Sequence, residues 1–427
     1  MPRNPPVEGL RVALVGNMNN NAFTQMRYFR DMGADAVLFP YATDADGQSA
    51  HFAPQADTYQ WEKWADHVRI LPVPNANQAV TGWPLKLKPP PAVAPVAAAL
   101  SKFDRVLGTG IAPAVFERMG RRLDGFSAYS VGIEFYGTPA FSAATRQRNL
   151  RGLLHRRVRA VQARGVRKAG VCFNADMGLT AESFAQLGVE FERLPTPMVY
   201  TGEDYAAGPL SDAAREAARR MESASLSLLC AARHMWMRPA GLLEREWNLT
   251  TKHSDWPFRA LAEFVSRNPA AKPVLVSITY GPDVAASKRL VAELGIEEFV
   301  CWLPILRRRE IMALLSLADA GIGEFLLDEG LLWGGTGFEV LAAGRPLLQA
   351  FNFTEASFAA QFGYAPPPLL DTKSASALAD HLQWLYHNRE RAMQTGHDSA
   401  QWFEAHAGRG LARQWLQALA AVDPGRA

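Results

Sequence analysis

A glycine-rich stretch near residue 335 has the composition of a phosphate-binding turn. Gly335, Thr336 and Gly337 precede good helix formers at 338–343, so a flexible turn is predicted to lead into a helix. Such a turn presents unpaired backbone N–H groups and the positive end of a helix dipole to phosphate oxygens. Glu339 falls in the first turn of this helix. An ordinary loop–helix–strand unit has the same composition, so the stretch alone leaves both interpretations open.

The most basic segment of the chain covers residues 146–168, where apolar residues recur near helical spacing. A cationic amphipathic helix can bind an anionic membrane or a phosphorylated acceptor. It can also be the solvated side of a helix whose other side packs inward. Both interpretations stay open. The cations are Arg146, Arg148, Arg151, Arg156, Arg157, Arg159, Arg164, Arg167 and Lys168.

Short apolar runs alternate with helical patterns along the chain, which is typical of an α/β protein with parallel sheets. A composition shift at residues 200–209 predicts a linker between two such halves. Strands are predicted at 10–15, 35–39, 103–107, 126–131, 171–174, 226–231, 273–278, 299–303, 318–322 and 346–348. Helices are predicted at 22–32, 112–119, 211–222, 258–265, 285–294, 308–317, 338–343, 375–386 and 399–420.

Length and composition restrict the class of protein. A chain of 427 residues is too long for one core and predicts at least two domains. The net charge of +3 is too small to indicate nucleic acid binding. Cys172, Cys230 and Cys301 are far apart and lack metal-site spacing, so we expect neither disulfides nor zinc. We find no signal peptide pattern and no apolar run long enough to span a membrane, which favours a cytoplasmic protein.

The segment 226–348 resembles the donor domain of a GT-B glycosyltransferase, and is most similar to the retaining family 4 enzymes. Four motifs occur in the family's order. His253 stands where the family usually has glycine, and Thr279 replaces another glycine. The motifs are Ala232-Arg233-His234, Thr251-Lys252-His253-Ser254-Asp255, Ile278-Thr279-Tyr280-Gly281-Pro282-Asp283, and the run from Phe338 to Pro346.

The resemblance implies a role for each motif in binding a nucleotide-sugar donor. Arg233 and Lys252 would stabilise the negative charge that develops on the leaving diphosphate. The backbone of Gly335, Thr336 and Gly337 would donate hydrogen bonds to it. Glu339 would accept hydrogen bonds from the ribose hydroxyls. Thr279 and Leu303, at two predicted strand ends, complete the expected donor-binding residues.

The chain departs from the family at one carboxylate. The family has a glutamate eight positions before the second one, but Leu331 stands there, and Glu329 is the acid that could replace it near the sugar. Glu134 is a further candidate for contact with the acceptor or the donor sugar. Asp44 and Asp46 form an Asp-x-Asp pattern, which we interpret as a solvated turn rather than a metal site.

The prediction is a GT-B fold of two Rossmann-like, doubly wound domains that face each other across a cleft. The N-terminal domain, 1–205, would bind the acceptor through the loops that follow Val15, Leu107 and Val131. The C-terminal domain, 206–395, would bind the donor, and a helix in 396–427 would pack back toward the N-terminal domain. The expected acceptor contacts are Gly16, Asn17, Asn19, Gly108 and Thr109; a polar turn with helix-capping asparagines is the alternative for 17–21.

The expected function is transfer of a sugar from a nucleotide sugar to a glycan or a lipid-linked acceptor, with retention and without metal or cofactor. The basic segment 146–168 suggests an anionic acceptor, and peripheral contact with the inner membrane face, as in envelope polysaccharide assembly. Alternatives are an inactive glycan-binding or partner subunit, favoured by the missing glutamate, and a nucleotide-sugar epimerase or a phosphorylase on the same scaffold.

Overall fold

The described part of the chain forms two compact units. The computed structural model describes residues 7–41, 53–71, 93–128, 150–175, 178–241, 247, 251–327 and 334–423. Unit 1 comprises Met1–Ala56, Gln60–Tyr200 and Ala407–Ala427, and unit 2 comprises Asp57–Tyr59 and Thr201–His406.

Unit 1 is built on a six-stranded parallel sheet with the order β2-β1-β3-β4-β5-β6. Its central strands are short apolar runs, as expected for strands that are covered on both faces. Val15 is in register with Phe39 on one side and with Gly108 on the other. The strands are β1 (Arg11–Val15), β2 (Asp35–Phe39), β3 (Arg105–Thr109), β4 (Gly125–Ser127), β5 (Val171–Asn174) and β6 (Glu192–Arg193).

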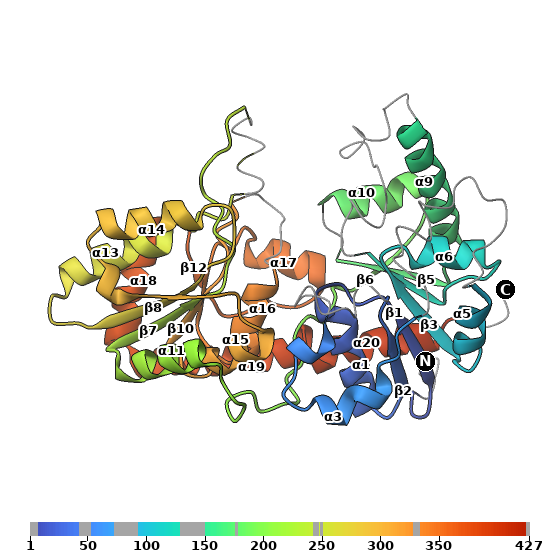
Figure 1. The fold of residues 1–427 in the computed structure, drawn as a ribbon, viewed down its shortest axis with the longest axis horizontal. Coiled ribbons are helices and arrows are strands. Elements are labelled where there is room, and N and C mark those ends of the chain that lie inside the picture. The colour runs from blue at the N-terminus through green and yellow to red at the C-terminus, as the bar shows by residue number, and fades with distance from the viewer. Residues whose placement is uncertain are drawn as a thin grey trace. The chain divides into compact units, whose positions relative to one another are not determined.

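Helices cover both faces of the unit 1 sheet (Figure 1). The alternation along β1 assigns the faces, because Val12 and Leu14 pack with α1 and α20 while Ala13 and Val15 pack with α5, α6, α9 and α10. On the first face the Trp415 ring stacks on Phe173 at 3.9 Å. The helices are α1 (Asn21–Asp31), α3 (Trp61–Trp64), α5 (Val93–Leu100), α6 (Ala112–Arg118), α9 (Leu150–Lys168), α10 (Gly178–Leu187) and α20 (Arg409–Ala420).

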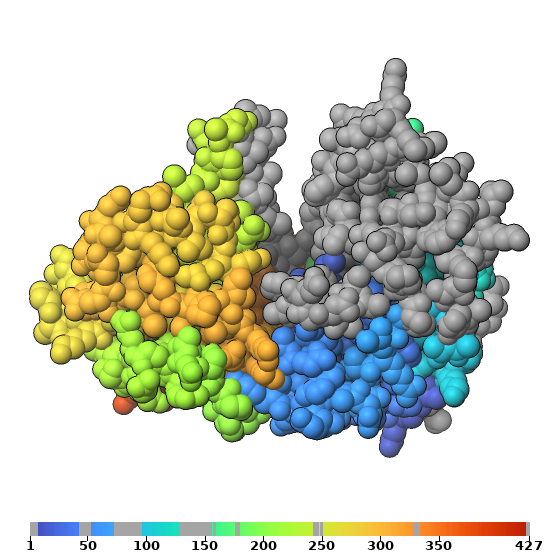
Figure 2. Space-filling model, viewed as in Figure 1, coloured from blue at the N-terminus to red at the C-terminus, as the bar shows by residue number. Residues whose placement is uncertain are grey.

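Unit 2 repeats this plan with a parallel sheet in the order β12-β11-β10-β7-β8-β9. One face is covered by α13, α14 and α18 and the other by α11, α15 and α16 (Figure 1). Figure 2 shows α11, in green, beside α15, in orange, on the surface of this unit. The strands are β7 (Leu226–Cys230), β8 (Pro273–Ile278), β9 (Val300–Leu303), β10 (Ala320–Ile322), β11 (Leu347–Gln349) and β12 (Leu370–Asp371). The helices are α11 (Asp212–Ser223), α13 (Trp256–Arg267), α14 (Val284–Glu293), α15 (Arg308–Leu315), α16 (Gly335–Ala342), α17 (Glu355–Phe362), α18 (Ala375–His387) and α19 (Arg389–His406).

The C-terminal helices differ from the sequence prediction. A single helix was expected over 399–420, but α19 ends at His406 and α20 begins at Arg409. Gly408, between them, has φ −100 and ψ −123, outside the helical region. The prediction was wrong because the apolar spacing in the sequence continues through this break. The break itself depends on the backbone conformation of one glycine, Gly408.

Strand order locates the functional edge of each sheet. In unit 1 the chain moves from β1 to β2 and then returns to place β3 on the other side of β1. In unit 2 it moves from β7 through β8 to β9 and then places β10 on the other side of β7. Ligands of doubly wound sheets bind at the carboxyl ends of the strands beside such a reversal. The loops after β1 and β3, and those after β7 and β10, are therefore the places to look for a site.

Candidate functional site

The loop after β7 is fixed by a buried histidine. His234 is 1% exposed, and its Nδ1 and Nε2 lie 2.8 Å from Ser287 Oγ and 3.2 Å from Ser277 Oγ. Burial lowers the pKa of His234 below its usual value of 6.5, so the ring is neutral at pH 7. The two serines belong to α14 and β8, so His234 ties three elements together directly beside Arg233.

The turn after β8 fits against this loop because it contains Gly281. Gly281 has φ +122, and a Cβ there would lie 2.4 Å from His234 O and 2.7 Å from His234 N. No side chain can be added without moving the loop. The guanidinium of Arg233 lies 5.6 Å from the centroid of the Tyr280 ring, within range of a cation–π contact. Gly281 thus allows the close approach that places Arg233 at the strand ends.

Lys252 reaches the same edge from the loop before α13. Its backbone N–H donates to Met235 O at 2.8 Å, and its Nζ forms an ion pair with the carboxylate of Glu324. The neighbouring His253 has φ +42, in the left-handed region where glycine is favoured. This conformation explains why glycine suits the position in the family that the sequence resembles.

The glycine-rich stretch forms the first turn of α16 rather than a turn before it. The sequence placed the helix at 338–343, but α16 begins at Gly335, with Gly334 as its N-cap. The prediction left the glycines outside the helix because glycine has a low helix propensity. In the first turn of a helix this low propensity costs little. A Cβ on Gly335 would meet no described atom within 4 Å, whereas one on Gly334 would lie 3.3 Å from Glu324 Oε2. Among the described residues, therefore, none lies against Gly335 at the start of α16, while Glu324 lies beside Gly334.

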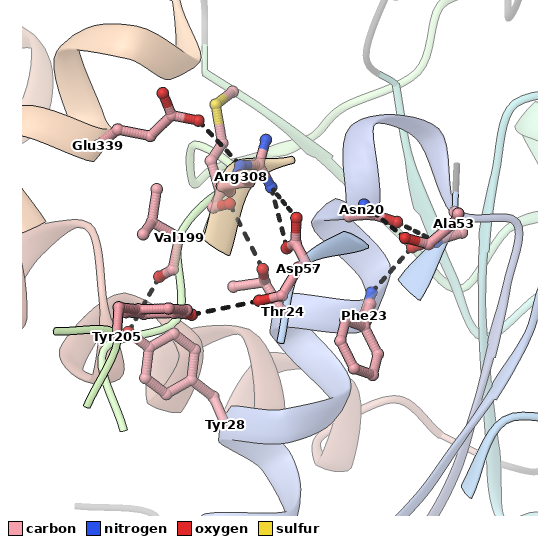
Figure 3. A network of polar contacts seen from close by, with 12 residues as sticks. Asn20, Phe23, Thr24, Tyr28, Ala53, Asp57, Val199, Tyr205, Arg308 and Glu339 are labelled. Atoms are coloured by element: carbon pink, nitrogen blue, oxygen red, sulfur yellow. Dashed lines mark hydrogen bonds and ion pairs between the residues drawn. The ribbon is translucent and has the colours of Figure 1, made fainter. Parts of the chain in front are cut away.

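Glu339 is buried in α16 and already has a cationic partner. Arg308 Nε donates to Glu339 Oε1 at 2.9 Å, and Arg308 Nη1 donates to Asp57 Oδ2 at 3.1 Å (Figure 3). Burial raises the pKa of Glu339, and the charges of Asp57 and Glu324 add to this effect, while Arg308 opposes it. Burial also disfavours the charge on Arg308, but attraction to Asp57 and Glu339 is larger and raises its pKa.

Residues Asp57–Tyr59 belong to unit 2 although they come from the N-terminal half of the chain. Glu203 accepts hydrogen bonds of 2.6 Å from Thr58 Oγ1 and from Tyr59 N. Arg309 Nη1 donates to Thr58 O at 2.7 Å. These contacts hold the Asp57 carboxylate, whose side chain is 2% exposed, against Arg308.

Thr279 and Leu303 are also brought together at the ends of β8 and β9. Both the backbone N–H and the Oγ1 of Thr279 donate to Leu303 O at 2.8 Å. Leu303 is 3% exposed, so its side chain belongs to the core. The Thr279 hydroxyl therefore holds the two strand ends in place.

Five charged side chains thus meet around the carboxyl edge of unit 2. Lys252 and Arg308 are cations, and Asp57, Glu324 and Glu339 are carboxylates, each largely buried. Phosphate oxygens arriving here would compete with Glu324 for Lys252. Ribose hydroxyls would donate hydrogen bonds to a Glu339 carboxylate of which one oxygen already accepts from Arg308.

Sequence reasoning did not identify Arg308, Glu324 or Asp57. Arg308 and Glu324 closely follow the ends of β9 and β10, so their positions at strand ends were a usable signal. Asp57 had no such signal in the sequence, because it is 251 residues away from Arg308. Its part in the network depends on the tertiary fold.

The expected acceptor residues of unit 1 lie at the ends of β1 and β3. A Cβ on Gly16, which has φ +88, would lie 2.5 Å from Thr109 Oγ1, and Gly108 pairs with Val15. Asn17 is 1% exposed, and its Oδ1 accepts from Phe23 N at 3.0 Å in the first turn of α1. This contact favours the helix-capping interpretation for Asn17.

Other polar groups lie near this edge. Asn19 is exposed, with φ 53. Ser127 Oγ and Asn174 Nδ2, at the ends of β4 and β5, are buried and have no hydrogen-bond partner among the described residues. Buried polar atoms without partners carry a free-energy cost, which a bound polar ligand would relieve.

Several expectations fall outside the described residues, namely those for Glu134, Glu329, Leu331, Asp44 and Asp46, and for 146–149 of the basic segment. Within the described ranges, no group of three or more His, Cys, Asp or Glu residues could hold a metal ion. The three cysteines are unpaired and buried. No helix in the described part of the chain has the length and apolar character that a membrane span requires.

Comparison with solved structures identifies the fold. HepE from Anabaena in complex with UDP superposes with a TM-score of 0.57 at 14% identity, over 96% of this chain and 100% of that one. A glycosyltransferase from Rickettsia africae gives a TM-score of 0.56 at 11% identity, over 97% and 99% of the two chains. WaaG, a glycosyltransferase involved in lipopolysaccharide biosynthesis, gives 0.52 at 15% identity, over 96% and 100%.

The predicted GT-B fold is confirmed by these superpositions over nearly the whole chain. No protein-family model matches the sequence. No curated protein matches it either. The similarity is therefore one of architecture.

Proposed function

We propose that this protein is a glycosyltransferase that takes its sugar from a nucleotide-sugar donor bound by unit 2. The observation that carries the proposal is the set of charged side chains at the β7–β10 edge of unit 2, beside the first turn of α16. The fold adds support, because HepE, which has the same architecture, has been crystallised with UDP and with UDP-glucose.

In this proposal the donor diphosphate lies at the start of α16. The N–H groups of the first helical turn and the cations Lys252 and Arg233 face its developing charge. Charge that builds up on the leaving diphosphate is stabilised by such preorganised groups more strongly than charge in the ground state. Positive charge from the protein itself fits a reaction without a metal ion, as the family 4 resemblance implies.

Glu339 fixes the nucleoside end of the donor. Arg308 occupies Oε1, so a ribose hydroxyl donates to Oε2. The ion pair with Arg308 holds the carboxylate in one orientation, which lowers the entropy lost on binding. Glu324 lies between Lys252 and Gly334. In this proposal it is the carboxylate near the sugar, the role for which Glu329 was the candidate from the sequence.

The acceptor is a glycan or a lipid-linked sugar, bound at the carboxyl edge of unit 1. The support is the group of polar atoms at the ends of β4 and β5, together with Gly16, Gly108 and Thr109 at the strand-order reversal. Retention, a place in polysaccharide biosynthesis, and action at the cytoplasmic face of a membrane belong to the same proposal.

The test is transfer activity of the full chain. Purified protein is incubated with a panel of nucleotide sugars and with glycan or lipid-linked acceptors, and release of the nucleoside diphosphate is measured. We expect one donor to be turned over, faster with acceptor than without, and the product linkage to show the stereochemistry by NMR. Binding of a glycan without turnover of any donor would support the inactive partner subunit instead.

A further inference from the structure

A cavity of about 500 Å³ lies between α9 and α10 of unit 1. Its polar lining includes Arg156, Arg159, Gln162, Arg164, Arg167 and Ser183, and none of its described lining residues is acidic. The volume lies within the range of small-molecule sites in proteins. The size of the cavity thus suits a small molecule, and its charge suits one that carries an anionic group.

The helix that forms one wall has unusually concentrated positive charge. Seven Arg or Lys residues and no Asp or Glu occur in α9. Arg156 and Arg159 are three residues apart, as are Arg164 and Arg167, and like charges at this spacing destabilise a helix. Glu117 of α6 neutralises part of the charge through Arg164 and Lys168, at 3.0 and 2.7 Å. Arg167 Nε donates to Leu187 O of α10 at 3.0 Å.

The cavity is connected to the loop after β3. Gln162, which lines it, donates through Nε2 to Gly110 O and accepts through Oε1 from Ala114 N, both at 3.0 Å. A Cβ on Gly165 would lie 2.1 Å from Pro113 O, so α9 packs tightly against the start of α6. A ligand in the cavity would therefore lie beside Gln162, whose side chain contacts Gly110 directly after β3.

We propose that this cavity binds a phosphate group and that the phosphate belongs to the acceptor. Guanidinium groups bind phosphate through paired N–H donors, and the hydrogen bonds that Arg164 and Arg167 make within the described residues engage only their Nε atoms. A concave cavity selects a discrete phosphate rather than a general negative surface. Assignment of the phosphate to the acceptor rests on the proposed function, whereas phosphate binding does not.

The test compares three variants of the full chain by calorimetric titration with pyrophosphate. Arg156→Gln/Arg159→Gln removes two cations of the cavity. Arg215→Gln/Arg219→Gln, on α11 of unit 2, removes two exposed arginines of another helix. Lys252→Gln removes a cation of the proposed nucleotide site. We expect one pyrophosphate-binding event to be weakened about tenfold or more in the cavity variant and to be unchanged in the other two variants.

A second measurement identifies the source of the phosphate. Sedimentation with phosphatidylcholine vesicles, with and without phosphatidic acid, reports a lipid headgroup, while binding of pyrophosphate without vesicle binding reports a soluble phosphorylated ligand. Either kind of binding supports the proposed phosphate site if only the cavity variant loses that binding. Equal losses in the cavity and α11 variants, or no loss in the cavity variant at an unchanged melting temperature, would overturn the proposal. Phosphate binding without any sugar transfer would leave the cavity standing and contradict only the proposed function.

Discussion

The guanidinium of Arg308 is held between two carboxylates, with Nε 2.9 Å from Glu339 Oε1 and Nη1 3.1 Å from Asp57 Oδ2. All three side chains are nearly buried, with 14% or less of each exposed. The glutamate with the proposed ribose role is therefore also part of an ion network inside unit 2. This arrangement links the stability of the unit to the geometry of its site.

Removing the cation from this network should destabilise the protein. In Arg308→Met the carboxylates of Asp57 and Glu339 lose their buried partner, and we expect the free energy of unfolding to fall by about 3–5 kcal/mol. Arg308→Met/Asp57→Asn/Glu339→Gln removes the charges as well and should recover at least half of that loss. Calorimetric unfolding of the full chain measures both. A triple variant no more stable than the single variant would contradict the network.

Gly281 should be intolerant of a side chain. Gly281→Ala combines φ +122 with a clash of the new Cβ against the His234 backbone. Gly295→Ala is the matched control, because its φ is +64 and its Cβ would meet no described atom within 4 Å. We expect the control to lose about 1 kcal/mol from backbone strain, and Gly281→Ala to lose clearly more and to weaken nucleotide binding through Arg233. Equal melting temperatures for the two variants would argue against the close approach.

His234 should make unit 2 sensitive to acid. Because burial lowers its pKa in the folded state below the usual 6.5, the unfolded state binds more protons as the pH falls below that value. Its contribution to stability is therefore fully present above pH 6.5 and is lost as the pH falls toward the folded pKa. The melting temperature of the original protein should fall more steeply than that of His234→Gln below about pH 6.5. His67, His253 and His406, whose pKa values are also lowered, are present in both proteins. Parallel curves would refute this role.

Lys252 and Glu324 should have opposite effects on nucleotide binding. Lys252→Gln removes a cation that the proposed function places at the diphosphate, and we expect the affinity of this variant for a nucleoside diphosphate to fall about tenfold. Glu324→Gln removes the carboxylate that competes for Lys252, so its affinity should rise, while turnover falls if Glu324 lies near the sugar. Calorimetric titration provides the affinities. Similar weakening in both variants would show that Glu324 binds the ligand rather than competing with it.

The core of both sheets could be predicted because buried parallel strands are continuous apolar runs. Such runs located β1, β7 and β8 to within a residue at either end. The edge strands β6 and β12 were missed because they have two residues each and do not belong to an apolar run.

The site was predictable only where its residues lie near recognisable motifs. Arg233, Lys252 and Glu339 follow from the family resemblance, and the structure brings all three to one unit and Arg233 and Lys252 to one sheet edge. The partners of Lys252 and Glu339 did not follow, because an ion pair such as Arg308–Asp57 joins residues 251 positions apart. Side-chain pairing at this distance depends on tertiary packing and leaves no periodic pattern in the sequence.

The central claim, that unit 2 binds a nucleotide sugar through Glu339, is tested most directly by titrating the full chain with a panel of nucleotide sugars. Glu339→Gln keeps the size of the side chain and removes the charge, and Glu263→Gln, on α13, is the exposed control. We expect at least one nucleotide sugar to bind the original protein and the control equally, and to bind Glu339→Gln about 10 to 100 times more weakly. Binding of that sugar with unchanged affinity to Glu339→Gln, or binding of none, would contradict the claim.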